Sequence, residues 1–333
     1  MNTATTPRAR LRAIPHLSFG FYPTPIEELP RLRAALGAHA PRLFVKRDDY
    51  TGPGFGGNKV RKLEYVLAQA QAEGAEVAIT VGGEKSNHAR VTAALCARLG
   101  LRCVLVLNAA AVKHAGWEPA SLAADKLYGA EIYRVSSREE RHTTTRALAE
   151  QFRREGKRVA EIPLGASIPL GALGFVRAVE EVQAQLAALG ASVTHIFHAS
   201  SSGGTQAGLL AGCQLFALNA QVIGISPDDP ADSIAAEVAQ IINGIGVLLD
   251  APLDTAVTVL DEYIGPGYGV DSSESATALE LLARTEGLLL DPVYSAKALA
   301  GLLDWIKRGK LTAQDSVLFW HTGGQLALFY KPE

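Results

Sequence analysis

The stretch that decides the fold is Gly56-Gly57-Asn58-Lys59-Val60-Arg61-Lys62-Leu63-Glu64. Two glycines precede a lysine, and apolar side chains then recur at helical spacing, so the pattern predicts a glycine-rich turn that opens into a helix. The lysine can lie on a solvated helix face, as most lysines do. It can also face a flat ligand, because glycines let a ligand approach the backbone. A lysine held against an apolar ligand can lose its proton and form a Schiff base, so Lys59 is a candidate for carrying an aldehyde cofactor.

Length and composition describe an ordinary globular protein. The chain has 333 residues, of which 48% are hydrophobic and 20% charged, enough for one large or two medium domains with a sizeable core. The formal net charge of −2 and the pI of about 6.5 give no electrostatic reason to expect nucleic acid or an anionic membrane as a partner. A small-molecule partner is therefore favoured.

Cysteine usage and the N-terminal segment bear on the compartment. Cys96, Cys103 and Cys213 lie in apolar runs without a CxxC pair or metal-ligand spacing, which predicts buried thiols in a reducing compartment and no metal site. The first 15 residues lack the apolar core of a secretory signal, and no run of about 18 apolar residues occurs. We therefore expect a cytoplasmic protein outside the membrane, with a loosely ordered segment before Pro15.

Strand and helix patterns alternate along the chain, which predicts parallel sheets covered by helices on both faces. Loops at the carboxyl ends of such strands form the ligand site. Expected strands are residues 43–46, 77–81, 102–107, 131–135, 158–162, 194–198, 221–225 and 316–320. Expected helices are residues 29–36, 58–73, 88–99, 119–127, 139–155, 170–189, 206–218, 230–245, 272–285 and a last one that ends at 308.

A break at Pro163-Leu164-Gly165-Ala166-Ser167-Ile168-Pro169 separates two groups of these elements. We place a domain crossing there. The expected fold is α/β with two lobes, each an open twisted parallel sheet. Residues 54–164 would form a small domain, and residues 1–53 and 165–333 would form a large one.

A serine- and glycine-rich loop, Ser200-Ser201-Ser202-Gly203-Gly204-Thr205, lies between an expected strand and an expected helix. Exposed N–H groups, the helix dipole and several hydroxyls suit a phosphate. The glycines fit neither GxGxxG nor GxxxxGK[ST], which favours a phosphorylated cofactor held by backbone over a dinucleotide. An unliganded serine-rich turn is the alternative.

A second loop, Gly82-Gly83-Glu84-Lys85-Ser86-Asn87-His88, follows a buried strand and opens a helix. An Asn amide there can bond a ring hydroxyl of a cofactor, and a Ser hydroxyl can bind a carboxylate or relay a proton. Alternatively, Ser86 or Asn87 only caps the helix that begins at His88. His88 by itself is expected to pack or to cap the helix rather than to act in catalysis.

A lysine loop, a phosphate cradle and a Ser-Asn loop on separate strands are what pyridoxal 5′-phosphate needs. The sequence resembles the fold-type II pyridoxal-phosphate enzymes, within the group that contains 1-aminocyclopropane-1-carboxylate deaminase and D-cysteine desulfhydrase. The matching motifs extend over nearly the whole chain. They are Tyr22-Pro23-Thr24-Pro25, Phe55 to Glu64, Ser86-Asn87, Gly171-x-x-Gly174-Phe175, Gly203-Gly204-Thr205-Gln206-Ala207-Gly208, Asp291-Pro292-Val293-Tyr294 and His321-Thr322-Gly323-Gly324.

The resemblance implies a fold like that of tryptophan synthase β, pyridoxal 5′-phosphate as cofactor, an amino acid substrate and a homodimer. Lys59 would be the Schiff-base lysine and Asn58 a neighbour of the ring. Ser86, Asn87 and His88 would lie at the substrate carboxylate and ring hydroxyl, and Tyr268 and Tyr294 would face the substrate. The phosphate would be bound by Ser202, Gly203, Gly204 and Thr205.

Two positions discriminate within this group. The deaminases have Glu after the Asp-Pro-Val-Tyr motif, where it meets the pyridine nitrogen, and Leu after the final His. Here these positions are Ser295 and Thr322, as in the D-cysteine desulfhydrases. A carboxylate would keep the ring nitrogen protonated, which cyclopropane opening demands, whereas a hydroxyl suffices when a leaving group departs from Cβ. We therefore expect β-elimination from a 3-substituted alanine, with D-cysteine giving pyruvate, hydrogen sulfide and ammonia.

One departure from the group keeps the substrate open. The group commonly has Gly-Gly-Ile-Gln ahead of Ser-Asn, whereas this chain has Gly82-Gly83-Glu84-Lys85. Either Lys85 recognises an acidic substrate side chain, such as a sulfonate or a carboxylate, or both charged residues point to solvent. 1-Aminocyclopropane-1-carboxylate deamination and L-cysteate or other sulfur amino acid lyase activity are the alternatives. A cofactor carrier or sensor would not need Ser86 and two tyrosines, and a dinucleotide oxidoreductase lacks its fingerprint.

Overall fold

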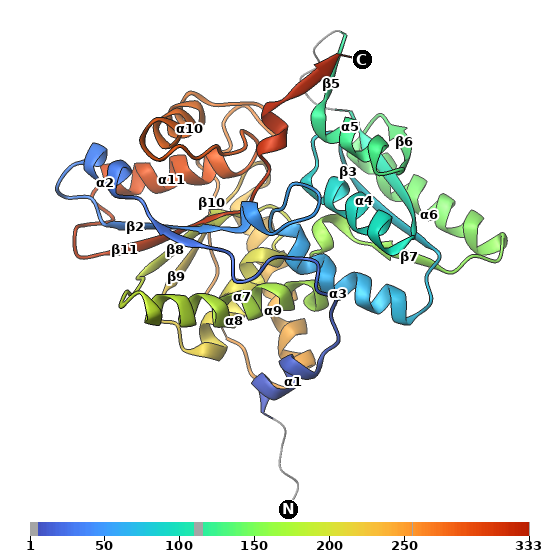
Figure 1. Cartoon of the computed structure of the whole chain (residues 1–333), viewed down its shortest axis with the longest axis horizontal. Coiled ribbons are helices and arrows are strands. Elements are labelled where there is room, and N and C mark those ends of the chain that lie inside the picture. The colour runs from blue at the N-terminus through green and yellow to red at the C-terminus, as the bar shows by residue number, and fades with distance from the viewer. Residues whose placement is uncertain (1–5, 110–115, 255, 333) are drawn as a thin grey trace, which may run out of the picture.

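The computed structural model describes residues 6–109, 116–254 and 256–332, whose strands form two main sheets (Figure 1). The larger sheet has six strands in the order β1 (Ile26–Glu28), β2 (Arg42–Arg47), β11 (Ser316–His321), β8 (His195–Ala199), β9 (Gln221–Ile225), β10 (Thr258–Leu260). The smaller sheet has four strands in the order β6 (Glu131–Val135), β4 (Arg102–Asn108), β3 (Val77–Gly83), β7 (Val159–Ile162).

Both sheets are parallel apart from the edge strand β1, which pairs antiparallel with β2. Successive residues of the central strands enter different cores: Phe44 packs in one hydrophobic cluster and Leu43 in another. Side chains alternate between the faces of a sheet, so a strand with apolar residues at every position needs cover on both sides. The expected α/β class with helix-covered parallel sheets is confirmed.

Helices supply that cover on the larger sheet. In Figure 1, one side of the sheet carries α2 (Pro30–Leu36), α10 (Ser273–Glu286) and α11 (Ser295–Lys307). The other side carries α7 (Pro169–Ala188), α8 (Gly204–Phe216) and α9 (Ala231–Leu249). The last of these helices ends four residues later than expected, because Leu249 continues the buried stripe of Ile241 and Ile245.

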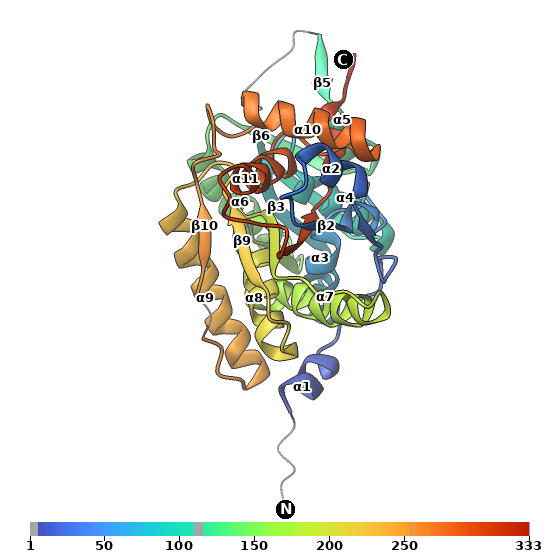
Figure 2. The same cartoon turned by 90° about the vertical axis from the view of Figure 1, so that its left-hand side faces the viewer.

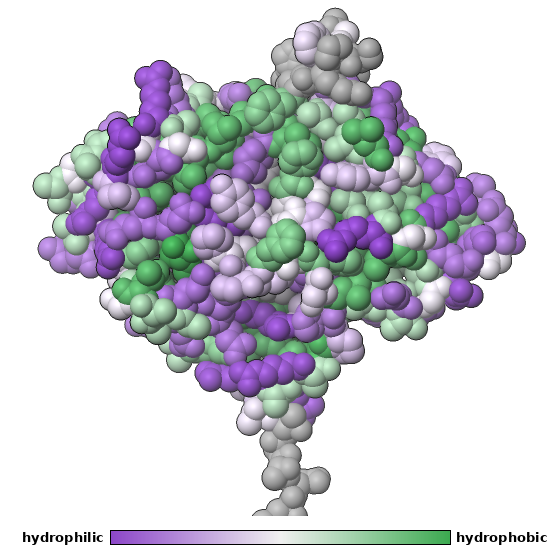
Figure 3. All heavy atoms as spheres, in the orientation of Figure 1, coloured by the Kyte–Doolittle hydropathy of each residue, from purple (hydrophilic) through white to green (hydrophobic). Residues whose placement is uncertain are grey.

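The smaller sheet lies among α3 (Lys59–Ala72), α4 (Asn87–Leu99), α5 (Ala120–Leu127) and α6 (Arg138–Arg154), on the right in Figure 1 and behind the larger sheet in Figure 2. Its central strand β3 is buried along its whole length. The outer surface is mixed: Figure 3 shows hydrophilic residues spread over this face of the molecule, with apolar ones interspersed.

The helices α3 and α7 approach each other closely at a glycine. A Cβ at Gly174 of α7 would lie 2.2 Å from the carbonyl oxygen of Arg61, so a side chain there would push α7 away from α3. At the other end of the molecule, β12 (Tyr330–Pro332) pairs antiparallel with β5 (Trp117–Pro119). The domain boundaries at residues 54 and 165 stay a prediction.

The expectation of a loosely ordered segment before Pro15 is wrong for its described part. Residues Pro7–Ala13 form α1, which Thr6 caps by accepting a hydrogen bond from Ala9 N. Leu11 is buried, and Arg8 Nη2 donates to the carbonyl oxygen of Leu215 at 2.9 Å. The sequence around α1 gives no local signal of this packing, because the residue that Arg8 contacts lies 207 positions away. Residues 1–5 lie outside the described residues.

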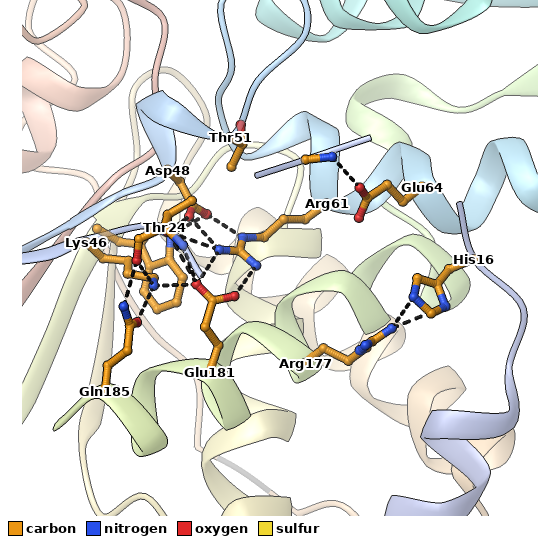
Figure 4. A network of polar contacts seen from close by, with 12 residues as sticks. His16, Thr24, Lys46, Asp48, Thr51, Arg61, Glu64, Arg177, Glu181 and Gln185 are labelled. Carbon is orange, nitrogen blue, oxygen red and sulfur yellow. Dashed lines mark hydrogen bonds and ion pairs between the residues drawn. The ribbon is translucent and has the colours of Figure 1, made fainter. Parts of the chain in front are cut away.

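A buried polar network fixes the end of β2 to the start of α3 (Figure 4). The buried Asp48 carboxylate accepts hydrogen bonds from Arg61 Nε and Nη2, each at 2.8 Å, and from Trp320 Nε1 at 2.8 Å. Arg61 also pairs with Glu181 of α7 at 2.9 Å. Burial alone would raise the pKa of Asp48, but the charge and hydrogen bonds of Arg61 hold it below its ordinary value.

We expect Arg61→Met to lower the free energy of unfolding by about 3–5 kcal/mol, because the variant leaves the carboxylates of Asp48 and Glu181 buried with one cation fewer. Arg153→Met is the matched control, since Arg153 pairs with Glu161 at 2.6 Å with both side chains largely exposed. It should change the same quantity by about 1 kcal/mol or less. Urea unfolding of both variants measures the difference, and equal losses would contradict the assignment.

Candidate active site

One cleft collects the carboxyl ends of strands from both sheets and encloses about 930 Å³ of space. Its walls come from the start of α3, the loop after β3, the loop after β8, and the segment after β11. This is the edge at which ligands bind in open α/β sheets. Of the residues singled out from the sequence, those that line it are Asn58, Lys59, Ser86, Asn87, His88, Ser202, Gly203, Thr205, Tyr268, Tyr294 and Thr322.

Lys59 is the first residue of α3, and the two glycines before it fix where the helix begins. Gly57 has φ of +103°, and a Cβ there would lie 2.8 Å from the carbonyl oxygen of Thr322. Gly57 N donates to the carbonyl oxygen of Asp48 at 2.9 Å, and Asn58 N donates to that of Thr322 at 3.0 Å. The turn is thus pinned on both sides, and a larger residue in place of Gly57 would displace the lysine.

Burial changes the charge state of two lysines in the cleft. It lowers the pKa of Lys59 to about 8, so far more free amine is present near neutral pH than for an ordinary lysine. Lys62 lies three residues on, on the same helix face. Its pKa is held well below the ordinary value by burial and by the neighbouring charge of Lys59. Sequence reasoning missed Lys62, although its spacing from Lys59 was the available signal.

The Ser/Gly loop lies directly beside Lys62. Lys62 Nζ donates to Ser167 Oγ at 2.9 Å, and Ser167 Oγ lies 2.7 Å from Ser202 Oγ. The N-cap residue Gly203 has no side chain to cap α8, and of the N-terminal N–H groups Gly204 N donates to Ser167 Oγ at a long 3.3 Å, so the helix start can bind an anion. A Cβ at Gly204 would lie 3.0 Å from Lys62 Nζ, so the absence of a side chain leaves room for the amino group of Lys62 next to the loop.

The Ser-Asn loop both caps α4 and lines the cleft. Ser86 caps α4 by accepting a hydrogen bond from Ala89 N at 3.2 Å, and it also lines the cleft. Asn87 Oδ1 accepts from Arg90 Nη1 at 2.7 Å, which leaves the amide nitrogen of Asn87 to donate to a ligand. His88 Nε2 lies 2.7 Å from Thr80 Oγ1, and burial holds the pKa of His88 well below its ordinary value. His88 is therefore neutral.

Two tyrosines face each other across the cleft. The hydroxyls of Tyr268 and Tyr294 lie 2.5 Å apart, and burial raises the pKa of both, that of Tyr294 further. Asp291 positions Tyr294 by accepting its backbone N–H at 2.8 Å. Lys297, also missed from the sequence, donates to the carbonyl oxygens of Ile264 at 2.7 Å and Gly267 at 2.8 Å and so pins the loop of Tyr268.

The structure leaves three of the sequence-predicted binding residues outside the cleft wall. Ser295 is the first residue of α11, and its hydroxyl lies 2.5 Å from Asp291 Oδ1, the carboxylate that holds this helix start. Lys85 lines a separate groove with Val270 and Pro292, because the turn before Ser86 directs it away from the cleft. Gly204, the first residue of α8, does not line the cleft.

Charged residues that the sequence did not single out complete the cleft. Arg138 and Arg141 reach it from the first turn of α6, and Asp228 and Asp229 reach it from the segment after β9. Arg138 Nη2 pairs with Asp228 Oδ2 at 3.0 Å. Most positions of α6 are polar or charged, so its sequence pattern did not indicate that the side chains of Arg138 and Arg141 face the cleft.

These residues fit a phosphorylated pyridine aldehyde. An amine of lowered pKa, a helix start beside a second lysine amine, and a free amide donor meet in one space. Two buried polar atoms of cleft-lining residues, His88 Nδ1 and Ser200 Oγ, have no hydrogen-bond partner among the described residues. Buried polar atoms without partners are rare in native proteins and indicate a ligand.

Comparison with known proteins gives consistent results. Residues 17–323 match the family described as pyridoxal-phosphate dependent enzymes. The chain is 39% identical to a D-cysteine desulfhydrase of Yersinia pestis (strain Pestoides F), over 98% of this chain and 99% of that protein. It is also 39% identical to a D-cysteine desulfhydrase of Yersinia pseudotuberculosis serotype O:1b (strain IP 31758), over 97% and 98%.

Solved structures show the same fold. An ACC deaminase homologue superposes with a TM-score of 0.89 at 34% identity, over 99% of this chain and 97% of that one. The processed form of threonine deaminase isoform 2 from Solanum lycopersicum superposes with a TM-score of 0.68 at 17% identity, over 96% and 88%, a likeness of fold alone.

The pKa of Lys59 predicts how the cofactor loads. Apoprotein mixed with pyridoxal 5′-phosphate should acquire the absorbance of the lysine-bound cofactor at a rate that rises with pH and levels off above about 8, because only the neutral amine attacks the aldehyde. An ordinary lysine would give a rate that still rises at about pH 10, and that outcome would contradict the assignment. Lys59→Ala should abolish the absorbance, whereas Lys62→Met should retain it and bind the cofactor more weakly.

Proposed function

This chain belongs to the pyridoxal-phosphate-dependent enzyme family, and on that basis we propose that it is a lyase that eliminates the β-substituent of a 3-substituted alanine. D-Cysteine is the best candidate substrate, with pyruvate, hydrogen sulfide and ammonia as products. The observation that carries the proposal is that Lys59, Ser86 and the Tyr268–Tyr294 pair share one cleft with the phosphate cradle. The identity of 39% to proteins named D-cysteine desulfhydrase supports the choice of substrate.

Bound pyridoxal phosphate supplies an electron sink that makes the Cα proton of an amino acid acidic. The chain supplies the proton acceptor and the orientation. Lys59, with a pKa of about 8, takes a proton from carbon and gives it up again near neutral pH. Ser86 and Asn87, at the start of α4, hold the substrate carboxylate with a hydroxyl, an amide and the positive end of the helix.

The tyrosine pair handles the leaving group. Both phenols stay protonated at neutral pH because burial raises their pKa values. We assign the role of proton donor to Tyr268, because the guanidinium carbon of Arg138 lies 5.1 Å from the centre of its ring, and the orienting role to Tyr294, whose hydroxyl lies 2.5 Å from that of Tyr268. As the Cβ–S bond breaks, sulfur leaves with the bonding electrons and takes the proton of Tyr268, and water then hydrolyses the enamine to pyruvate and ammonia.

Leaving groups of different basicity test this role. Tyr268→Phe should lower kcat for D-cysteine by about 100-fold, the lower end of the usual contribution of general acid catalysis. It should change kcat for 3-chloroalanine by less than about tenfold, because chloride needs no proton to depart. Steady-state pyruvate release gives both values. Equal losses on the two substrates would show that Tyr268 serves binding or folding instead.

The alternative chemistry is ring opening of 1-aminocyclopropane-1-carboxylate, which the likeness to an ACC deaminase homologue keeps in view. Pyruvate release from D-cysteine, L-cysteate and the cyclopropane acid, measured in parallel on the cofactor-loaded enzyme, separates the candidates. We expect turnover of a sulfur amino acid and none of the cyclopropane acid. Turnover of the cyclopropane acid alone would overturn the proposal, and full cofactor loading without any turnover would indicate a carrier or sensor.

We further propose a cytoplasmic homodimer, the assembly that the family resemblance implies. The three cysteines are free and buried, which suits a reducing compartment. Three aromatic side chains around the lysine loop, Phe21, Tyr50 and Phe55, are 73%, 56% and 59% exposed and offer apolar surface for a second copy. Sedimentation should give twice the chain mass of 35.2 kDa.

A further inference from the structure

Arg90 is a buried guanidinium behind the cleft, three residues after Asn87 in α4. Its side chain is fully buried and does not line the cleft. Its Nε donates to the carbonyl oxygen of Gly54 at 2.8 Å, and its Nη1 donates to Asn87 Oδ1 at 2.7 Å and to Ser121 Oγ at 3.2 Å. Gly54 belongs to the loop that leads to Lys59. One side chain therefore contacts both the lysine loop and the Ser-Asn loop.

These contacts are not those of a buried ion pair. In the part of the chain that the structure describes, no ion pair within 4.0 Å joins a nitrogen of Arg90 to a carboxylate. Burial lowers the pKa of Arg90 to about 10, against the effect of the Asp125 carboxyl farther away, so the guanidinium is charged at neutral pH. Its hydrogen bonds go to neutral acceptors instead. Hydrogen bonds from a charged donor are stronger than those between neutral groups, so these acceptors are held firmly.

Arg90 determines which edge of the Asn87 amide faces a ligand. A guanidinium has five donor hydrogens and no acceptor, so the amide atom that it contacts must be the oxygen. The nitrogen, Nδ2, then points the other way, toward Gly324, where a Cβ would lie 2.6 Å from it. The absence of a side chain at Gly324 leaves room for this nitrogen. Because Asn87 lines the cleft, its amide offers donors to a bound ligand and no acceptor.

The ring hydroxyl of the cofactor is the acceptor that suits these donors. In pyridoxal phosphate the aldehyde lies between the ring hydroxyl and the phosphate arm. A ring joined to Lys59 with its phosphate at the Ser/Gly loop would therefore direct its hydroxyl away from that loop. Asn87 follows a strand of the other sheet. Asn58, the amide next to Lys59, already donates from Nδ2 to Thr205 Oγ1 at 3.0 Å, on the side of the Ser/Gly loop.

We propose that Arg90 is a positioning residue for the cofactor, which holds the amide of Asn87 so that Nδ2 donates to the ring hydroxyl oxygen. The charge of the guanidinium polarises the amide through Oδ1, which makes its N–H groups stronger donors and favours the anionic form of the ring oxygen. The second hydrogen of Nδ2 stays free for the substrate carboxylate. The assignment deepens the proposed site and rests on its cofactor, whichever substituent the enzyme eliminates.

Two cofactors that differ only in the ring oxygen test this role on the full-length protein. The quantity is the Kd for pyridoxal 5′-phosphate divided by the Kd for 3-deoxypyridoxal 5′-phosphate, both from equilibrium dialysis, because this Kd ratio cancels a general loss of packing. Arg90→Met should raise the Kd ratio by about tenfold or more, the usual loss for a hydrogen bond to a charged group. An unchanged ratio would overturn the proposal, because Arg90 would then serve the fold alone.

Ser121→Ala is the matched control. It removes another acceptor of the same guanidinium nitrogen and leaves the contact with Asn87 in place. It should change the Kd ratio by less than about twofold, the size of effect expected without loss of a hydrogen bond to the ring oxygen. A rise as large as that of Arg90→Met would overturn the proposal, because any disturbance of the guanidinium would then have the same effect.

A double-mutant cycle shows whether Arg90 acts through Asn87. Asn87→Ala should raise the Kd ratio by about tenfold or more. Adding Arg90→Met to it should change the ratio by less than about twofold, since the amide that Arg90 orients is then gone. Additive losses would overturn the assignment, because Arg90 would then affect the ring oxygen by another route.

Asn87→Asp gives a test that leaves Arg90 in place, should Arg90→Met fail to fold. A carboxylate at this position accepts from Arg90 but donates nothing to the ring oxygen, so the Kd ratio should rise by at least about tenfold. The urea midpoint of unfolding should not fall, because the helix start and the guanidinium both favour an acid there. A lower midpoint or an unchanged Kd ratio would overturn the proposal. None of these measurements involves turnover, so a wrong assignment of substrate would leave every result unchanged.

Discussion

The site depends on the buried ion pair between Asp48 and Arg61. The carboxylate of Asp48 holds the guanidinium of Arg61 in the first turn of α3, while the carbonyl oxygen of the same residue accepts the N–H of Gly57 at 2.9 Å. Asp48 thus holds the segment that carries Lys59 on both sides, at Gly57 before the lysine and at Arg61 after it. Buried charges are tolerated only when each has its partner in good geometry, so the pair admits a single arrangement of β2 against α3. The position of the reactive amine follows from that arrangement.

The charges inside the cleft are arranged for a ligand more than for the protein alone. Lys59 and Lys62 lie close enough for the charge of the first to lower the pKa of the second, and Arg141 has no acidic partner among the residues described. Such an arrangement opposes folding, because each buried cation loses hydration. A bound phosphate beside Lys62 would offset part of that penalty. The network around Asp48, fully paired and outside the cleft, supplies the rigidity that the cleft itself lacks.

Much of the fold was predictable because its signals are local. Apolar runs marked all four strands of the smaller sheet and the four central strands of the larger one, whereas its short edge strands β1 and β10 were missed because each has only three residues. The glycines of the lysine loop were expected to admit a ligand, but Cβ atoms at Gly56 and Gly57 would meet carbonyl oxygens of Asp49 and Thr322. The residues that escaped prediction act through distant partners. Lys297 reaches carbonyl groups about 30 positions away, and α1 is held by side chains bonded to α8. Ser295 matches a family motif in the sequence and was therefore expected to bind the cofactor. In the structure its hydroxyl instead donates a hydrogen bond to Asp291 Oδ1 at the start of α11, which the sequence did not indicate.

Charge polarity along the cleft also constrains how a substrate can lie. The phosphate cradle with Lys62 and the hydrogen-bonded tyrosine pair form separate parts of the cleft wall. An amino acid whose carboxylate meets Ser86 and Asn87 must then direct its β-substituent toward the tyrosines or away from every donor in the cleft. A β-substituent directed toward the tyrosines meets two protonated phenols whose hydroxyls lie 2.5 Å apart, so placement of the carboxylate and protonation of the leaving group become one geometric requirement.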